Sequence, residues 1–331
     1  MPLYHLDQYW YELPPQQIAH YPVGVREHAR LMVIDRASGA IRHERIEALP
    51  DYFSADDALI VNTSKVRKAR FLGQRKSGGR IECLLIENLG NCTWRVFLKM
   101  HARTKLGMQF TLGACEAEVI AVEDRTACIR LNKDPDGGLL PLPPYMKRDA
   151  SHLDDERYQT VYANQEGSIA APTAGLHLSQ AMLETLRQRG VQLHEVALHV
   201  GRGTFQSVTT NDIRDHTMHH EFYEVGCAQD LLGAHQTKRI TCVGTTSVRV
   251  LESAWQGDSF ASGLQTTDLF MYPGKSFMVT DRLLTNFHIP SSTLLMLVSA
   301  FGGYELMKDA YKEAVRLGYR FLSYGDGMLI V

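Results

Sequence analysis

The chain has 331 residues, 44% of them hydrophobic and 22% charged, and a formal net charge of −2. These values are ordinary for a globular protein with a large core and exclude a low-complexity chain, and the length predicts two domains. The N-terminus lacks a basic segment followed by a hydrophobic run, and the longest hydrophobic run, around residues 294–298, is far shorter than the ~20 residues of a membrane span. The six cysteines form no CxxC pair. We therefore expect a cytoplasmic protein with reduced thiols and no membrane contact.

The first part of the chain, residues 1–64, has the pattern of an α/β fold. Two prolines predict the start of a helix at 14–19. Alternating and apolar residues predict strands at 31–35 and 40–45, joined by a turn. Residues 58–61 are apolar on both faces, which predicts a buried and possibly parallel strand.

The next part, residues 65–156, consists of short β-rich segments separated by polar or glycine-containing turns at even spacing. This pattern predicts a small antiparallel barrel or sandwich inserted into the α/β fold. The expected strands are 80–86, 93–98, 107–112, 116–122 and 127–131.

Basic residues are concentrated at the start of this insert. Between Lys65 and Arg80 there are seven Lys or Arg residues and no acidic residue. Clustered cations gain affinity for a polyanion by releasing counterions from its phosphates, so one interpretation is a nucleic-acid contact. An ordinary solvated face is the alternative.

The last part, residues 157–331, returns to an α/β pattern. The expected helices are 181–189, 248–255, 293–301 and 309–317, and the expected strands are 191–200, 238–243 and 278–284.

Three glycine-containing loops in this last part lie at the expected strand and helix ends: residues 167–177, 201–205 and 244–247. Glycine lets the backbone approach a ligand closely, and helix N-termini offer free N–H groups. Ligands of open α/β sheets bind beyond the carboxyl ends of the strands, so the three loops are candidates for one shared site. A tight packing loop is the alternative for residues 167–177.

Several other classes of site are disfavoured. The loop at 244–247 lacks the lysine of a phosphate loop, and the glycines at 201 and 203 do not complete a dinucleotide fingerprint. A cluster of the form HxxHHE resembles a metal site but is not HExxH, and the alternatives are a polar loop or contacts with RNA or a ligand. Its members are His216, His219, His220 and Glu221.

Five stretches together resemble the S-adenosylmethionine:tRNA ribosyltransferase-isomerase family, in the right order and over essentially the whole chain. They are YQTVYA at 158–163 with GSIAAPTAGLH at 167–177, HVGRGTF at 199–205, GTTSVR at 244–249 with LES at 251–253, LTNFH at 284–288 with STLLMLV at 292–298, and SYGD at 323–326.

One stretch departs from the family. Where NDTRVxPAR is usual, this chain has NTSKVRKAR at 62–70, so Thr63 and Lys65 replace the acid and the arginine. Contacts of that loop with a substrate would therefore differ here. Leu178, Arg202 and Gly327 are milder departures.

The resemblance implies an α/β domain that is discontinuous in sequence, with an inserted small antiparallel β-barrel. It also implies transfer of the ribosyl part of S-adenosylmethionine to 7-aminomethyl-7-deazaguanine at the tRNA wobble position. Epoxyqueuosine-tRNA would form, and adenine and methionine would leave. The acceptor lies in a single-stranded anticodon loop, where a base is accessible without melting a helix. S-adenosylmethionine would be consumed, no metal or resident cofactor would be needed, and we expect a monomer.

The resemblance also assigns roles to residues. A general base and a proton donor for adenine are needed, and the candidates are His177, His199 and His288, with Glu252 as a carboxylate alternative. Candidates for holding the substrate are Thr173, Gly175, Gly203, Thr204, Thr245, Thr246, Ser247 and Arg249. Candidates for holding tRNA are Lys65, Arg67, Lys68, Arg70, Arg75 and Lys76.

Two alternatives from other classes stay open at this point. One is a metal-dependent hydrolase built on the HxxHHE cluster. The other is a non-catalytic tRNA-binding homologue that lost activity through the altered loop at 62–70.

Overall fold

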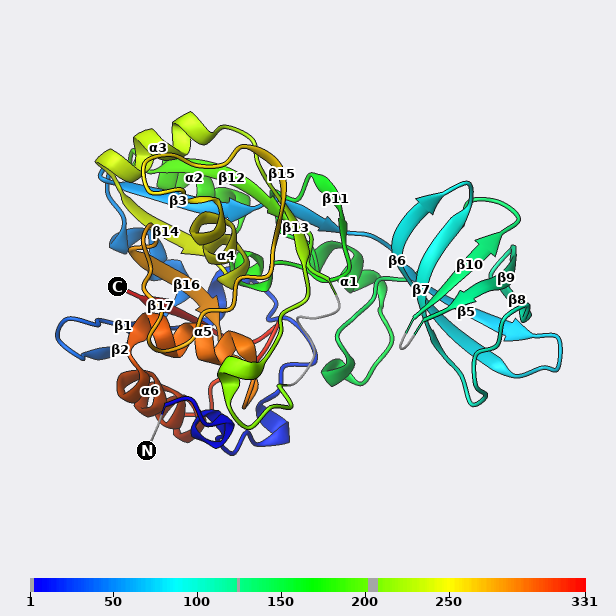
Figure 1. Cartoon of the computed structure of the whole chain (residues 1–331). Coiled ribbons are helices and arrows are strands. Elements are labelled where there is room, and N and C mark those ends of the chain that lie inside the picture. The colour runs from blue at the N-terminus through cyan, green and yellow to red at the C-terminus, as the bar shows by residue number, and fades with distance from the viewer. Residues whose placement is uncertain (1–2, 124–125, 202–207) are drawn as a thin grey trace. The chain divides into compact units, whose positions relative to one another are not determined.

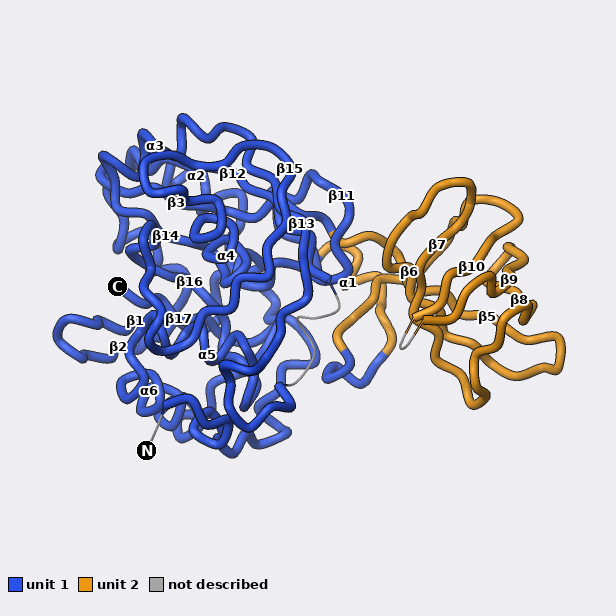
Figure 2. Tube along the Cα trace, in the orientation of Figure 1, with its two compact units in different colours: residues 1–65, 144–148, 157–331 blue, residues 66–143, 149–156 orange. Residues whose placement is uncertain are grey.

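The computed structural model of the chain describes residues 3–123, 126–201 and 208–331. Its residues cluster into two compact units (Figure 2). Unit 1 comprises Met1–Lys65, Pro144–Arg148 and Arg157–Val331, and unit 2 comprises Val66–Pro143 and Asp149–Glu156.

Unit 1 is built on a nine-stranded mixed sheet (Figure 1). Its order is β15 (Gly263–Thr267), β13 (Glu221–Val225), β12 (Gln192–Leu198), β3 (Asp57–Asn62), β14 (Arg239–Val243), β16 (Arg282–Asn286), β17 (Gly327–Ile330), β1 (Arg30–Ile34) and β2 (Ile41–Arg45). The central strands β12, β3, β14 and β16 are parallel to one another, so their carboxyl ends lie along one edge. A separate pair joins β4 (Ser64–Val66) to β11 (Gln165–Ser168).

Helices cover both faces of this sheet because the buried strands are apolar on both sides. Leu59 and Val61 of β3 pack into one cluster with Leu183 of α2 (Gln180–Gln188). Ala58 and Ile60 of the same strand pack into a second hydrophobic cluster. That second cluster contains residues of α3 (Ala228–Thr237), α4 (Thr245–Ala254), α5 (Thr293–Gly302) and α6 (Tyr304–Arg316). The two-sided burial of residues 58–61 thus follows directly from their composition.

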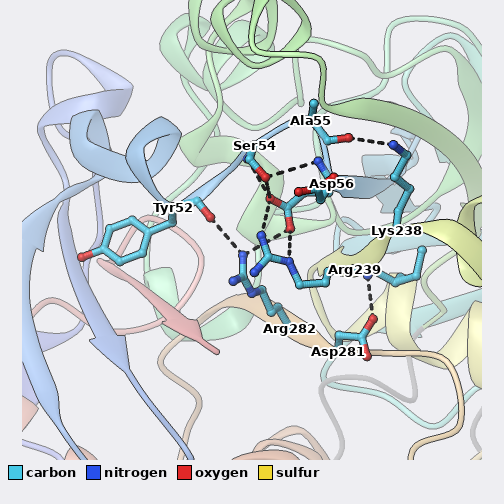
Figure 3. A network of polar contacts seen from close by, with 10 residues as sticks. Tyr52, Ser54, Ala55, Asp56, Lys238, Arg239, Asp281 and Arg282 are labelled. Atoms are coloured by element: carbon cyan, nitrogen blue, oxygen red, sulfur yellow. Dashed lines mark hydrogen bonds and ion pairs between the residues drawn. The ribbon is translucent and has the colours of Figure 1, made fainter.

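A polar network fastens the amino ends of three parallel strands (Figure 3). The Asp57 carboxylate, fully buried at the start of β3, accepts hydrogen bonds from Arg239 at 2.9 and 3.0 Å and from Arg282 at 3.4 Å. It also accepts from the Ser54 main-chain N–H at 2.7 Å. The network lies at the ends of β3, β14 and β16 opposite to their carboxyl edge.

Unit 2 is a closed antiparallel barrel around its own core. Its strands follow the order β10 (Ala127–Leu131), β7 (Thr93–Lys99), β6 (Arg80–Gly90), β5 (Arg70–Arg75), β8 (Gln109–Leu112) and β9 (Cys115–Val122). Alternate residues such as Ile81, Cys83 and Leu85 fill the interior. The unit also contains most of α1 (His152–Arg157). An α/β fold with an inserted antiparallel barrel is therefore confirmed.

Several local expectations were wrong. The helix expected at 14–19 is a single 3-10 turn, η2 (Pro15–Gln17). The strand expected at 278–284 begins at Arg282, because the Glu252 carboxylate binds the main-chain N–H groups of residues 278–280. The structure also contains five elements that the sequence pattern did not predict: α3, β5, β13, β15 and β17. Within the described ranges, every helix is too short or too polar to cross a membrane.

Candidate functional site

A cavity of about 250 Å³ opens in unit 1 where the parallel strands end. Val200 lies just beyond β12, Gly244 follows β14 and His288 follows β16, and all three line the cavity. The loop at 170–174 lines another part of the wall. The position agrees with the rule that ligands of open α/β sheets bind beyond the strand carboxyl ends.

The loop at 167–177 ends in a 3-10 turn, η6 (Thr173–His177), held by one amide. Asn286 Oδ1 accepts a hydrogen bond from the Thr173 hydroxyl at 2.8 Å, and Asn286 Nδ2 lies 3.0 Å from His177 Nε2. Thr173 and Asn286 line the cavity, whereas His177 is 4% exposed and lies outside its lining. Burial, with the positive charges of Arg26 and Arg320, lowers the pKa of His177 to about 4, so its ring is neutral near pH 7.

His288 faces the cavity and is fixed by hydrogen bonds on three atoms. Its Nε2 lies 3.1 Å from the Thr285 hydroxyl, and its main-chain N–H donates to the Tyr311 hydroxyl at 3.0 Å. Its carbonyl accepts from the Tyr11 hydroxyl. Burial lowers the pKa of His288 to about 3, so this ring is also neutral at ordinary pH.

The amino end of α4 reaches the same cavity. Gly244 has a φ of +87°, a conformation that favours glycine, and turns the chain from β14 into the helix without a side-chain cap. Thr245 and Thr246 line the cavity. Ser247 does not, because its buried hydroxyl donates to the Val243 carbonyl at 2.8 Å.

Arg249, expected to hold the substrate, lies in a buried ion pair with Glu221. Its guanidinium also donates to the Leu269 carbonyl at 3.1 Å. Glu221 in turn accepts from the Gly201 main-chain N–H at 2.9 Å. The structure therefore places this arginine in a contact between α4 and β13 and outside the cavity lining.

Because Glu221 is paired with Arg249, its carboxylate does not join the histidines of the HxxHHE cluster. His216 packs edge-on against Phe270, and His220 lies 3.9 Å from Asp268. In the part of the chain that the structure describes, no three His, Cys, Asp or Glu side chains are grouped as metal ligands would be. The geometry does not favour the hydrolase alternative.

Glu252 also lies away from the cavity lining. Its two carboxylate oxygens accept from the N–H groups of Met278, Val279 and Thr280 and from the Thr280 hydroxyl, at 2.8–3.2 Å. Four hydrogen bonds leave this carboxylate occupied in holding the segment before β16. We therefore do not retain Glu252 as a candidate base.

The remaining candidates have mixed positions. A Cβ on Gly175 would lie 2.0 Å from the Tyr162 hydroxyl oxygen, so glycine is required there for packing and not for the cavity. The His199 ring packs on Gly167, where a Cβ would lie 2.6 Å from Nδ1. Gly203 and Thr204 lie outside the described residues.

Sequence reasoning missed several polar groups of the cavity wall. Tyr145 and Ser323 share a short hydrogen bond, and burial raises the pKa of Tyr145 to about 12. Thr285, Asn286 and Ser292 also line the cavity. Asn286 and Ser323 lie within quoted motifs, which is the signal that could have identified them.

The altered loop at 62–70 is occupied by internal contacts. Asn62 Nδ2 donates to the Leu198 carbonyl at 3.1 Å, and the Thr63 hydroxyl donates to the Val196 carbonyl at 3.3 Å. Both residues are buried and neither lines the cavity. The departure at position 63 therefore affects packing against β12.

Three of the seven cations in the basic run are paired with acidic side chains. Lys65 contacts Glu166 and Lys68 contacts Asp155, each at 3.0 Å. Arg70 lies between Glu82 at 2.8 Å and Asp149 at 2.7 Å.

The other three candidates for holding tRNA, Arg67, Arg75 and Lys76, differ in their contacts. Arg67 donates to the Leu85 and Ile86 carbonyls, and burial lowers its pKa. Lys76 donates to Gln109, a neutral side chain, at 2.7 Å, and Arg75 lies beside it at the end of β5.

Comparisons with known proteins agree with this geometry. The family described as "Queuosine biosynthesis protein" matches residues 6–330. A protein of Trichlorobacter lovleyi named S-adenosylmethionine:tRNA ribosyltransferase-isomerase is 42% identical, covering 98% of this chain and 99% of its own. One of the same name from Carboxydothermus hydrogenoformans is 43% identical, with the same two coverages.

A solved structure is similar as well. The crystal structure of the S-adenosylmethionine tRNA ribosyltransferase of Thermotoga maritima aligns with a TM-score of 0.57 and 34% identity, covering 98% of this chain and 100% of that one. Since the family match and these relatives span nearly the whole chain, the chain belongs to the queuosine biosynthesis protein family.

Proposed function

We propose that this enzyme is an S-adenosylmethionine:tRNA ribosyltransferase-isomerase. It transfers the ribosyl part of S-adenosylmethionine to 7-aminomethyl-7-deazaguanine at the wobble position of tRNA. The product is epoxyqueuosine-tRNA, and adenine and methionine are released. The reaction consumes S-adenosylmethionine and requires no resident cofactor or metal, and the enzyme works as a monomer in the cytoplasm.

One observation carries the proposal: all five motif stretches contribute residues to a single cavity. Ala171 comes from the first stretch, Val200 from the second, Thr245 from the third, His288 from the fourth and Ser323 from the fifth. Segments more than 150 residues apart in sequence thus meet at one wall, as a shared ligand requires. The volume is slightly below the ~300–1,000 Å³ of most small-molecule sites, which suits one part of S-adenosylmethionine.

The reaction needs a group that removes a proton next to the sulfonium and a donor for the departing adenine. Of the candidate histidines, His288 is the one that lines the cavity formed by described residues. Its neutral ring can accept or donate a hydrogen bond at ordinary pH, although its low pKa makes it a weak base. The hydroxyls of Thr173, Thr245 and Thr246 supply further polar contacts.

The test is direct turnover. The protein is incubated with S-adenosylmethionine and tRNA that carries 7-aminomethyl-7-deazaguanine, and the nucleosides are analysed by mass spectrometry. Epoxyqueuosine with an equivalent amount of free adenine is the expected result. tRNA with unmodified guanine at the wobble position is the control. Binding of tRNA with S-adenosylmethionine left intact would overturn the proposal in favour of a non-catalytic homologue.

His288→Ala should lower kcat most among the three histidines, because His288 faces the cavity. His177→Ala and His199→Ala serve as the matched comparisons. Near wild-type turnover of all three variants would show that none of these three histidines takes part in the chemical step.

A further inference from the structure

Thr173, Asn286 and His177 form a chain of hydrogen bonds that starts at the cavity wall and ends in the protein interior. Thr173 and Asn286 line the cavity, and His177 lies beyond its lining. The two distances are 2.8 and 3.0 Å, so both contacts are good hydrogen bonds. One amide thereby binds both ends of η6, the turn that shapes this wall.

The direction of the chain follows from the orientation of the Asn286 amide, whose oxygen faces the Thr173 hydroxyl. A side-chain amide donates only from nitrogen and accepts only at oxygen. With Asn286 Oδ1 accepting from Thr173, its Nδ2 must donate to His177 Nε2. The imidazole is then neutral with its proton on Nδ1.

The opposite direction of these hydrogen bonds would make Thr173 a donor towards the cavity in place of an acceptor. If His177 carried its proton on Nε2, Asn286 would turn its oxygen to the ring and its nitrogen to Thr173. The Thr173 hydroxyl would then accept inside the protein and present its hydrogen to the cavity. The tautomer of a buried histidine therefore decides what Thr173 offers to a ligand.

We propose that His177 and Asn286 are positioning residues that make the Thr173 hydroxyl a hydrogen-bond acceptor for an amino or hydroxyl group of the substrate. Thr173 uses its one hydrogen on Asn286, which leaves its oxygen lone pairs as acceptors. S-adenosylmethionine carries suitable donors in its adenine amino group and ribose hydroxyls. The inference rests on the proposed function and assigns the recognition of such a donor to this part of the cavity.

The first test uses the wild-type protein and does not depend on turnover. The ¹⁵N chemical shifts of the His177 ring report which nitrogen carries the proton. We expect a protonated Nδ1 and an unprotonated Nε2 at pH 7. A proton on Nε2 would overturn the proposal even if the enzyme is active.

The second test is a double-mutant cycle on kcat/KM. Thr173→Val and Asn286→Leu should each lower kcat/KM about tenfold, since each removes one hydrogen bond of the recognition. If Asn286 acts through Thr173, the double variant should lose about as much kcat/KM as either single variant. Losses that multiply to about a hundredfold would overturn the proposal. Thr173→Ser keeps the hydroxyl and should retain more kcat/KM than Thr173→Val.

A further pair separates positioning from packing. His177→Gln retains an acceptor for the Asn286 amide, whereas His177→Leu is of similar size and has none. We expect the Gln variant to keep substantially more kcat/KM at equal thermal stability. Equal losses in the two variants would contradict a positioning role. Inactive wild-type protein, by contrast, would refute the proposed function and not the tautomer.

Discussion

The Arg249 guanidinium and the Glu221 carboxylate form a buried ion pair that joins α4 to β13. Glu221 also accepts from the Gly201 main-chain N–H, one residue after Val200 of the cavity wall. The pair therefore fixes the chain where it leaves the cavity. Because both groups are buried away from water, removing either one would leave the other charge without a counter-charge.

Glu221→Gln should lower the free energy of unfolding by about 3–5 kcal/mol, because it leaves the Arg249 charge buried without a counter-charge. Urea unfolding measures this change. Glu224→Gln on the same strand, at a half-exposed position, is the matched control and should cost less than ~0.5 kcal/mol. Equal effects of the two substitutions would show that the ion pair contributes no more to the free energy of unfolding than an ordinary half-exposed glutamate.

Asp57→Asn should destabilise the protein without changing the cavity. The carboxylate binds Arg239, Arg282 and Ser54 at the amino ends of the parallel strands. Loss of these charge-assisted bonds should cost about 2–3 kcal/mol in unfolding free energy. Since the cavity lies at the opposite ends of these strands, kcat per folded molecule should stay unchanged. Asp56→Asn, at an exposed neighbour, is the control.

The sequence was sufficient for the fold class and for the expectation that two of the glycine-containing loops meet in space. Two-sided apolar strands predicted a covered sheet, and even β-rich spacing predicted the barrel. The glycine-containing loops at 167–177 and 244–247 do meet at the cavity. These features depend on local composition and on the general rule for strand carboxyl ends, so no long-range contact had to be known.

Individual roles could not be predicted, because they depend on partners distant in sequence. Arg249 looked like a ligand for an anion until Glu221, 28 residues earlier, was found beside it. Glu252 looked like a base, but its carboxylate is bound to the N–H groups of residues 278–280. Asn286 gave no chemical signal of its own, since an amide becomes informative only when both of its neighbours are known.

Stability should fall as the pH is lowered from about 7 towards 5. Burial holds the pKa of His177 at about 4 and that of His288 at about 3, whereas an unfolded histidine titrates near 6.5. Between these values the unfolded state binds more protons, so acidification favours unfolding. Each residue should contribute about 2 kcal/mol of loss between pH 7 and pH 5.

Urea unfolding of wild type and His288→Gln at both pH values isolates one of these contributions. The variant should lose less stability on acidification than the wild type, by about 2 kcal/mol. The exposed His152→Gln variant is the control and should follow the wild type. A variant with an unchanged pH dependence would show that His288 is not buried in its neutral form.

Contact with tRNA should depend on Arg75 and Lys76 more than on the other cations of the basic run. Lys68 and Arg70 are paired with acidic side chains, which reduces the charge that they can offer to phosphates. Arg75 and Lys76 have no such acidic partner within 4 Å among the described residues, and with Arg130 they line a groove of about 530 Å³ in the barrel unit, whose wall also contains Glu116 and Glu118. Loss of two phosphate contacts, and of the counterion release that goes with them, would change the slope of log K against log salt by about 1.4–1.8.

Filter binding of tRNA at several salt concentrations tests this ranking. Arg75→Gln with Lys76→Gln should weaken binding and flatten the salt dependence by that amount. Lys68→Gln, which removes one charge from a paired position, should change the slope by much less than half of that amount. Because Lys68 and Lys76 are both lysines of the same short segment, a larger slope change for Lys68→Gln would locate the tRNA contact at the paired cations and reject the groove.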